Sequence, residues 1–179
     1  MTDSDRAERI RAMLEQHFEL IWRSLRRFGV REGEVDDAAQ EVFVVAAKRV
    51  DQILPERERA FLVGTAVRVA STFRRSARRH PEDPSEVLDE QLGLGLNPEE
   101  LSELRSARPV LQQILESMSV EQRTVFVLSE LEELAAPAIA EALSIPVGTV
   151  HSRLRGAREV FELATKRLLA KESFLEAKR

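Results

Sequence analysis

An acidic segment in the middle of the chain sets the first constraint on its fold. Prolines and glycines interrupt residues 81–103, which contain no Lys or Arg. The acidic residues of this segment are Glu82, Asp83, Glu86, Asp89, Glu90, Glu99, Glu100 and Glu103. Like charges repel and prolines break helices, so the segment is predicted to be a flexible linker. Helical apolar spacing flanks it, which predicts two small domains, at residues 6–80 and 104–171.

The remaining composition predicts an all-α fold for both domains. Of the 179 residues, 43% are hydrophobic, which is enough for packed cores, whereas only seven are glycine and seven are proline. Cysteine is absent, which excludes disulfides, thiolate catalysis and cysteine-ligated metal sites. His17, His80 and His151 lie far apart without metal-ligand spacing, so neither a metal nor a cofactor is expected.

The ends and the hydropathy of the chain give no sign of a membrane or of export. It has no run of about 18 apolar residues, the length needed for a membrane span. The N-terminus is polar and lacks the apolar core of a signal peptide. A cytoplasmic protein is therefore predicted.

Three helices are predicted in the first domain. The first is expected to place one apolar stripe in the core, formed by Ile10, Met13, Leu14, Phe18, Ile21, Trp22 and Leu25. Gly29 and Gly33 are expected to end that helix. The second helix begins near Asp36, and the third covers about residues 57–79.

The second predicted helix carries an acidic face near its start. Asp37, Gln40 and Glu41 have the i, i+3, i+4 spacing that brings side chains together, and Asp36 lies beside them. Such a face repels DNA and suits a basic protein surface. Acids that stabilise a helix N-terminus and face solvent explain the same pattern.

The third predicted helix ends in a basic cluster. Arg68, Arg74, Arg75, Arg78 and Arg79 occur in a stretch from Val63 to His80 that has no acid. Clustered arginines suit phosphate groups, and the aromatic rings of Phe61 and Phe73 suit stacking on unpaired bases. Core packing of the rings and solvation of the arginines is the alternative.

The second domain contains a predicted helix-turn-helix at about residues 136–158. Ile139, Ala140 and Leu143 are expected to pack the first helix, Ile145 the turn, and Val147, Val150, Leu154 and Ala157 the second helix. The opposite face of the second helix offers donors suited to the major groove: Thr149, His151, Ser152, Arg153, Arg155 and Arg158. An ordinary helical hairpin with a solvated basic face also fits this periodicity.

Enzyme signatures do not occur in the sequence. It has no phosphate-binding glycine loop, no dinucleotide-binding glycine pattern and no nucleophile elbow. No catalytic residue is therefore nominated.

These segments, in this order, resemble bacterial sigma factors of the sigma-70 family, and among them the small extracytoplasmic-function (ECF) type that has only regions 2 and 4. The stretch Asp36-Asp-Ala-Ala-Gln-Glu-Val-Phe43 resembles region 2.2, and Arg59-Ala-Phe-Leu62 with the basic helix end resembles regions 2.3 and 2.4. Three further segments resemble region 4 of the family: Met118–Glu132, Ile139–Leu143 and Pro146–Arg158. The resemblance covers nearly the whole chain.

The resemblance implies a subunit that directs RNA polymerase to promoters. Asp36, Asp37, Gln40 and Glu41 match the face that binds the β′ clamp helices of core RNA polymerase. The helix from Val147 would read the −35 element, with Ser152 and Arg155 facing bases. The segment that would hold the melted −10 element contains Phe61, Arg68, Thr72, Arg74, Arg75, Arg78 and Arg79. The outer side of the earlier region 4 helices would bind the β flap, and an anti-sigma factor is an expected partner.

Three positions depart from the family pattern. The family often has Asn where this chain has Arg68, Asp where it has Thr72, and Arg where it has Gly156, so its usual promoter sequence is not transferred. Two other functions stay open: a stand-alone helix-turn-helix regulator of duplex DNA, and a degenerate sigma-like protein that acts by binding other proteins.

Overall fold

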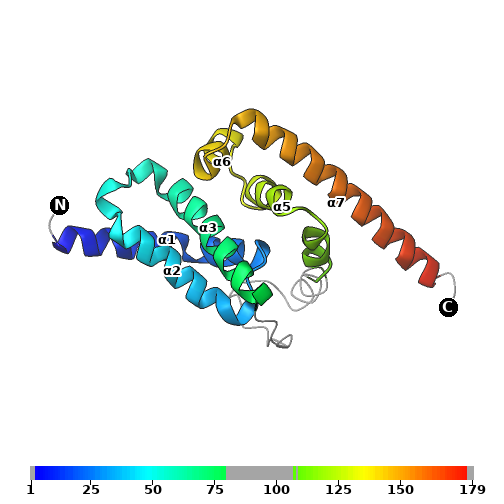
Figure 1. The fold of residues 1–179 in the computed structure, drawn as a ribbon, viewed down its shortest axis with the longest axis horizontal. Helices are drawn as coiled ribbons and strands as arrows, with labels where there is room; N and C mark the ends of the chain where they lie inside the picture. The colour runs from blue at the N-terminus through cyan, green and yellow to red at the C-terminus, as the bar shows by residue number, and fades with distance from the viewer. Residues whose placement is uncertain (1–2, 80–106, 108, 177–179) are drawn as a thin grey trace.

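A computed structural model describes residues 3–79, 107 and 109–176, with backbone only at residues 3, 78–79 and 171–176. All its regular elements are helical, and no strand occurs among these residues, as the composition predicts. The predicted linker, residues 81–103, lies outside the described part. Figure 1 shows the first three long helices on one side of the molecule and α5, α6 and α7 on the other.

The first helices form a small bundle around an apolar core. Helix α1 spans Asp3–Arg27, α2 spans Val35–Lys48 and α3 spans Glu58–Arg79. Three short 3-10 turns connect them: η1 (Glu32–Glu34), η2 (Val50–Gln52) and η3 (Pro55–Arg57). The three long helices pack on one another in pairs, and their buried side chains include Ile21, Leu25, Val42 and Leu62.

Two side chains of the predicted α1 stripe lie outside this core. Leu14 is 39% exposed and Phe18 is 41% exposed, although the ring of Phe18 stacks on Phe43 of α2 with centroids 6.2 Å apart. Met13 and Ile21 are buried as predicted. The bundle covers a narrower stripe of α1 than the apolar pattern predicted, because the helices packed against α1 leave the edge with Leu14 and Phe18 accessible to solvent.

Helix α1 ends just before Gly29, as predicted from the sequence. The φ of Gly29, at +92°, is a left-handed backbone conformation that favours glycine. The turn is closed by the Val30 amide, which donates to the Leu25 carbonyl at 3.1 Å. Gly33 lies in η1 and has ordinary backbone geometry with open space around it.

The second group of helices begins with helical turns at residues 109–116, followed by α5 (Val120–Phe126). A capping box starts α5: the Gln122 amide donates to the Ser119 hydroxyl, and the Ser119 amide donates to the Gln122 side chain. A five-residue π-helix, labelled η4 (Val127–Leu131), continues α5. Helix α6 spans Ala136–Leu143, and the long α7 spans Val147–Glu176.

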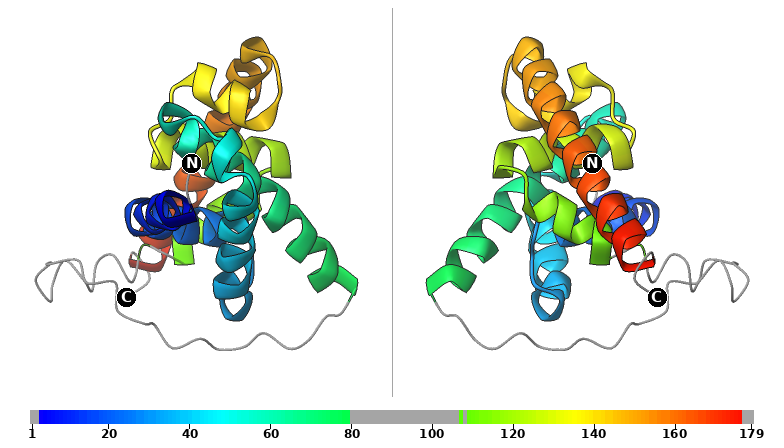
Figure 2. Two further views of the ribbon diagram at one scale, coloured as in Figure 1. Left: turned by 90° about the vertical axis from the view of Figure 1, so that its left-hand side faces the viewer. Right: turned by 90° about the vertical axis from the view of Figure 1, so that its right-hand side faces the viewer.

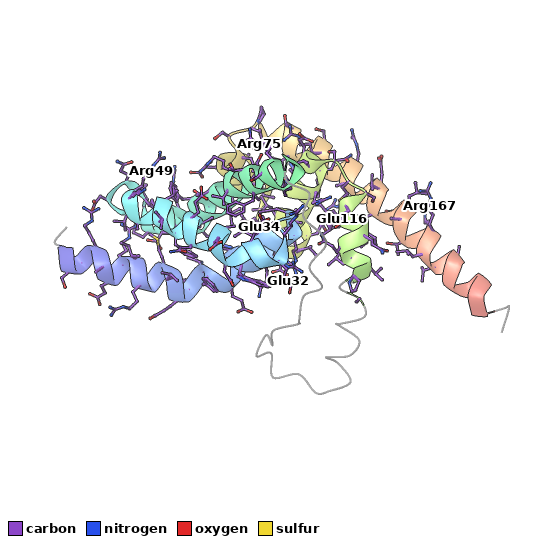
Figure 3. The ribbon with its side chains drawn as sticks, turned by 60° about the horizontal axis from the view of Figure 1, so that its bottom comes forward. Glu32, Glu34, Arg49, Arg75, Glu116 and Arg167 are labelled. Carbon is purple, nitrogen blue, oxygen red and sulfur yellow. The ribbon has the colours of Figure 1, made fainter. Side chains whose placement is uncertain are left out.

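The two groups of helices are in direct contact. Helix α6 packs on α3, and the π-helix packs on α1. Figures 1 and 2 show α6 beside α3 from different sides, while the C-terminal part of α7 extends away from the body. Figure 3 shows Arg167 on this projecting part of α7.

Candidate nucleic-acid and protein interfaces

Helix α2 presents the predicted acidic face to solvent. Its apolar side is buried through Val35, Ala38, Ala39, Val42, Phe43 and Ala46. The opposite side leaves exposed the four predicted residues Asp36, Asp37, Gln40 and Glu41. The Trp22 indole donates to Asp36 Oδ1 at 2.9 Å, which ties this acid to α1. The structure therefore brings the four residues onto one accessible face.

Helix α3 carries the predicted aromatic and basic residues, but not all on one face. Phe61 and Phe73 are half-buried and pack against the core, whereas Arg68 and Thr72 are exposed. Arg68 Nη2 donates to the Thr65 hydroxyl at 3.0 Å. The Thr72 hydroxyl in turn donates to the Arg68 carbonyl at 3.3 Å.

Two neighbouring arginines of α3 have different surroundings. Arg74 is half-buried, and its Nη1 donates to the Phe28 carbonyl at 2.6 Å, where it stabilises the end of α1. Arg75 is exposed on α3 (Figure 3), with its Nε 3.3 Å from the Ser71 carbonyl. Arg74 is therefore not an exposed member of the predicted basic cluster. The side chains of Arg78 and Arg79 lie outside the described residues.

Helices α6 and α7 form the predicted helix-turn-helix. Ser144 adopts a left-handed conformation with φ of +54°, and the Ile145 amide then donates to the Ala140 carbonyl at 3.0 Å. These bonds end α6 and turn the chain into α7. The core of the unit contains Ile139, Val150, Leu154 and Ala157. The prediction that Val147 packs there is wrong: it is 39% exposed, because it lies in the first turn of α7 before the contact with α6.

The exposed side of α7 carries most of the predicted major-groove donors. His151, Ser152, Arg155 and Arg158 are exposed, while Thr149 and Arg153 are half-buried. The Ser152 hydroxyl donates to the Thr149 carbonyl at 3.0 Å. Arg158 is paired with Glu130 of the π-helix, with Nη2 2.7 Å from Oε1. The side chains available for a base edge without breaking an ion pair therefore include Ser152 and Arg155.

The departure at Gly156 has a structural counterpart in α5. A Cβ at this position would lie 2.8 Å from the Gln122 Nε2. Gln122 belongs to the capping box of α5, so position 156 points toward the start of that helix.

Glu132 is a buried charged residue that the sequence reasoning missed. It follows the π-helix, and its side chain is only 2% exposed. Arg27 of α1 donates to its carboxylate, Arg23 lies 3.9 Å from Oε2, and Arg59 of α3 donates to its backbone carbonyl at 2.5 Å. Burial raises the pKa of the carboxyl, and the charges of Arg27, Arg23 and Arg59 oppose this shift. Its partners lie far away in sequence, so no local pattern could have found it.

The described residues offer no group of three His, Asp or Glu side chains that could hold a metal ion. No helix among residues 3–79 and 109–176 has the length and apolar content required to cross a membrane.

Comparison with known families identifies the two groups of helices. A family model described as sigma-70 region 2 matches residues 13–80, and one described as sigma-70 region 4 matches residues 109–160. The chain is 30% identical over 142 residues to the ECF RNA polymerase sigma-E factor of Escherichia coli K12, covering 74% of each protein. This chain belongs to the ECF type of the sigma-70 family. It is a sigma factor, a transcription initiation factor of a non-catalytic family that works with RNA polymerase.

Other relatives give the same result. The chain is 30% identical to the ECF sigma-E factor of Salmonella typhi, over 74% of each protein. It is 26% identical to the ECF sigma factor SigE of Mycolicibacterium smegmatis, over 82% of this chain and 58% of that protein. Together with the family models, which match both region 2 and region 4, they indicate a sigma factor and not a stand-alone helix-turn-helix regulator.

Solved structures share the fold. CnrH, in complex with the cytosolic domain of CnrY, superposes with a TM-score of 0.66 at 22% identity, covering 88% of each chain. The sigma factor RpoE of Bartonella quintana, in complex with the anti-sigma factor NepR, gives a TM-score of 0.66 at 15% identity. That match covers 87% of this chain and 96% of RpoE.

Proposed function

We propose that this sigma factor binds the β′ clamp helices of core RNA polymerase through the acidic face of α2. The observation that carries this proposal is the accessibility of Asp37, Gln40 and Glu41 beside one another, opposite a fully apolar side. Opposite charges steer association and fix the register of an interface. A basic surface on the polymerase is therefore the partner that this face suits.

The −35 element is assigned to the exposed side of α7. A helix with a buried apolar side and exposed donors fits the major groove. Ser152 and Arg155 are assigned to base edges because both are exposed near the start of the helix. Thr149, His151, Arg153 and Arg158 are assigned to phosphate contact or to support of the helix.

The −10 element is assigned to α3. Phe61 and the exposed Arg68, Thr72 and Arg75 lie along this helix, and Arg78 and Arg79 continue it in sequence. Aromatic and arginine side chains suit melted single-stranded DNA because every base offers a face for stacking. Arg74 is assigned to the stability of the fold, since it is bonded to the Phe28 carbonyl.

Two further partners and a location complete the proposal. The outer side of α5 and the π-helix would bind the β flap. An anti-sigma factor is the expected regulator, in line with the complex of RpoE with NepR. The cytoplasm is the expected location because the polymerase acts there.

Reconstituted transcription tests the proposal directly. The purified chain is mixed with bacterial core polymerase and fragmented genomic DNA of its host, and the 5′ ends of the transcripts are mapped. A discrete set of starts that requires the chain supports promoter direction and yields both elements. Tight core binding without new starts would indicate a degenerate sigma-like protein that sequesters a partner. The variant Asp37→Arg should reduce every start in parallel, whereas Arg155→Ala should reduce those with a matched −35 element most.

A further inference from the structure

Glu130 brings a negative charge to the side of α7 that is assigned to DNA. The sequence of α7 has no acid before Glu159. The structure supplies one from the π-helix, where Glu130 Oε1 accepts two bonds from the Arg158 guanidinium, from Nε at 3.2 Å and from Nη2 at 2.7 Å. Two bonds to one oxygen fix the guanidinium, so this carboxylate sets the direction in which Arg158 points.

Arg158 lies on the same side of α7 as Arg155, but farther from the start of the helix. His151, Arg155 and Arg158 have the i, i+4, i+7 spacing of one helix face. At ~1.5 Å per residue, Arg158 lies roughly 16 Å from Val147, the first residue of α7. The major groove is only about 12 Å wide. A helix that enters the groove by its first turns therefore places Arg158 over the sugar-phosphate backbone and not over the base edges.

The ion pair between Arg158 and Glu130 is not what holds α7 in place. The two side chains are 57% and 33% exposed, and exposed ion pairs contribute little to stability. Apolar contacts hold the helix instead: Phe126 of α5 stacks on Phe161 of α7 with ring centroids 5.1 Å apart, and Leu154 is buried. The pair can therefore be removed without loss of the fold, and its effect lies at the surface.

Glu130 reaches α7 because of its place in the π-helix. Residues two apart in a helix point to nearly opposite sides. Glu132, just after the π-helix, points into region 2, where Arg27 donates to its carboxylate. Glu130 therefore points the other way, toward α7. Single π-helical turns occur frequently at functional sites, because the extra residue re-aims the side chains around it.

An acid at this place opposes the binding of DNA phosphates. A cation that neutralises a phosphate releases counterions, which is the source of sequence-independent affinity and of its salt dependence. Arg158 can contribute in this way only when it leaves Glu130, and the freed carboxylate then stands beside the phosphate that it repels. The pair therefore removes one cation from the sequence-independent part of binding, while the base contacts assigned to Ser152 and Arg155 stay as they are.

We propose that Glu130 limits the sequence-independent affinity of α7 for DNA, by holding the guanidinium of Arg158 and by placing its own charge beside the phosphates. Glu130 binds neither base nor phosphate and acts through Arg158 as a positioning residue. This role rests on the proposed assignment of α7 to the −35 element. Its consequence is a lower affinity of the holoenzyme for arbitrary DNA, of which a genome offers about 10⁶–10⁹ competing sites.

Titration of the holoenzyme at several salt concentrations measures this limit. Core polymerase is kept saturating, and two fluorescent fork DNAs carry a matched or a scrambled −35 element. Glu130→Gln should bind both DNAs several-fold more tightly at low salt. The slope of log affinity against log salt should become steeper by about one, because one more phosphate is neutralised.

Glu32→Gln is the matched control for the change of charge. It also frees an arginine, since Glu32 Oε2 lies 2.6 Å from Arg26 Nη2, but it does so in region 2, where Figure 3 labels Glu32. The salt slope of this variant should equal that of the unsubstituted protein. An equal steepening in Glu32→Gln and Glu130→Gln would show an effect of overall charge and would overturn the proposal.

A double variant tests whether Arg158 is the cation that Glu130 holds. Arg158→Ala leaves the acid unpaired and should lower the affinity for both DNAs. Adding Glu130→Gln should restore the affinity, with the salt slope of the unsubstituted protein. A steep slope that persists in the double variant would overturn the proposal. Weaker binding by Glu130→Gln at an unchanged slope would also overturn it, because the pair would then only support the fold of α7.

The ratio of the affinities for the matched and the scrambled DNA tests the assigned function separately. A ratio of one in the unsubstituted holoenzyme would overturn base reading by α7. A steeper slope in Glu130→Gln supports the limit on phosphate binding at either ratio. A ratio above one together with an unchanged slope in Glu130→Gln would overturn the role of Glu130 alone.

Discussion

Arg158 of the recognition helix is held by Glu130 of the π-helix, with Nη2 2.7 Å and Nε 3.2 Å from the same carboxylate oxygen. The neighbouring Arg155 is exposed on the same helix. An arginine that already has a carboxylate partner must give it up to bind a base, whereas an arginine without such a partner exchanges only water. This difference separates the two arginines in their expected effect on DNA.

The variant Arg155→Ala is expected to reduce discrimination between a matched and a scrambled −35 element by about 1–3 kcal/mol, the value of one good bidentate base contact. Arg158→Ala is expected to lower the affinity for the matched and the scrambled DNA to a similar extent. Anisotropy titration of the holoenzyme with the two fork DNAs measures the difference. Equal discrimination by Arg155→Ala and the unsubstituted protein would remove the base-reading role of Arg155.

The variant Asp37→Arg is expected to weaken binding to core polymerase by on the order of 2 kcal/mol, because it sets a cation against a basic surface. Asp37 is exposed, so the free energy of unfolding should stay within about 0.5 kcal/mol of the original. Glu159→Arg is the control, because it makes the same change of charge in α7 of region 4, away from the acidic face of α2. An equal loss of core affinity in both variants would show a general charge effect and not a docking face.

Local sequence patterns predicted the surfaces that depend on one helix at a time. The i, i+3, i+4 spacing of Asp37, Gln40 and Glu41 was enough to predict a shared face, because side chains at these offsets always lie together on a helix. The break between Leu143 and Val147 predicted the turn of the helix-turn-helix, and the structure closes it with the left-handed Ser144.

Features that depend on two distant segments could not be read from the sequence. Glu132 lies 105 positions from Arg27 and is buried only because two regions meet. Leu14 and Phe18 have the same spacing as buried residues of α1, yet they are exposed because no third helix covers them. The π-helix that precedes Glu132 adds one residue to a turn, as the bond from the Glu132 amide to the Val127 carbonyl shows. Such an insertion cannot be predicted from the residue types alone.

The variant Gly156→Ala is expected to stabilise region 4 by up to about 1 kcal/mol, since alanine favours a helix interior over glycine. The new Cβ would meet the Gln122 Nε2 at 2.8 Å, which is the mobile end of a side chain and moves aside at small cost. Urea unfolding followed by circular dichroism measures the change. Destabilisation would show that the Gln122 side chain is fixed by its capping bond to Ser119.

The buried imidazole of His17 should make the free energy of unfolding depend on pH. It is only 9% exposed, and burial lowers its pKa below the ordinary value of 6.5; Glu58 opposes this shift and Arg59 adds to it. The folded state therefore favours the neutral ring. The stability linked to His17 is complete above the ordinary histidine pKa and is lost as the pH falls through the lowered pKa of the folded state.

Glu132 acts in the opposite sense, because its pKa is raised in the folded state. Its contribution to stability is complete below the ordinary glutamate pKa of 4.5 and is lost as the pH rises through the raised pKa of the folded state.

The variant His17→Gln isolates the first of these effects. The unsubstituted chain should lose stability as the pH falls below the ordinary histidine pKa of about 6.5, and His17→Gln should lose less because glutamine does not titrate there. His151→Gln is the matched control, since His151 is exposed on α7 and its removal should leave the profile unchanged. Urea unfolding at several pH values gives the three curves. If His17→Gln and His151→Gln followed the same curve as the unsubstituted chain, the acid sensitivity of the fold would have to come from a group other than His17.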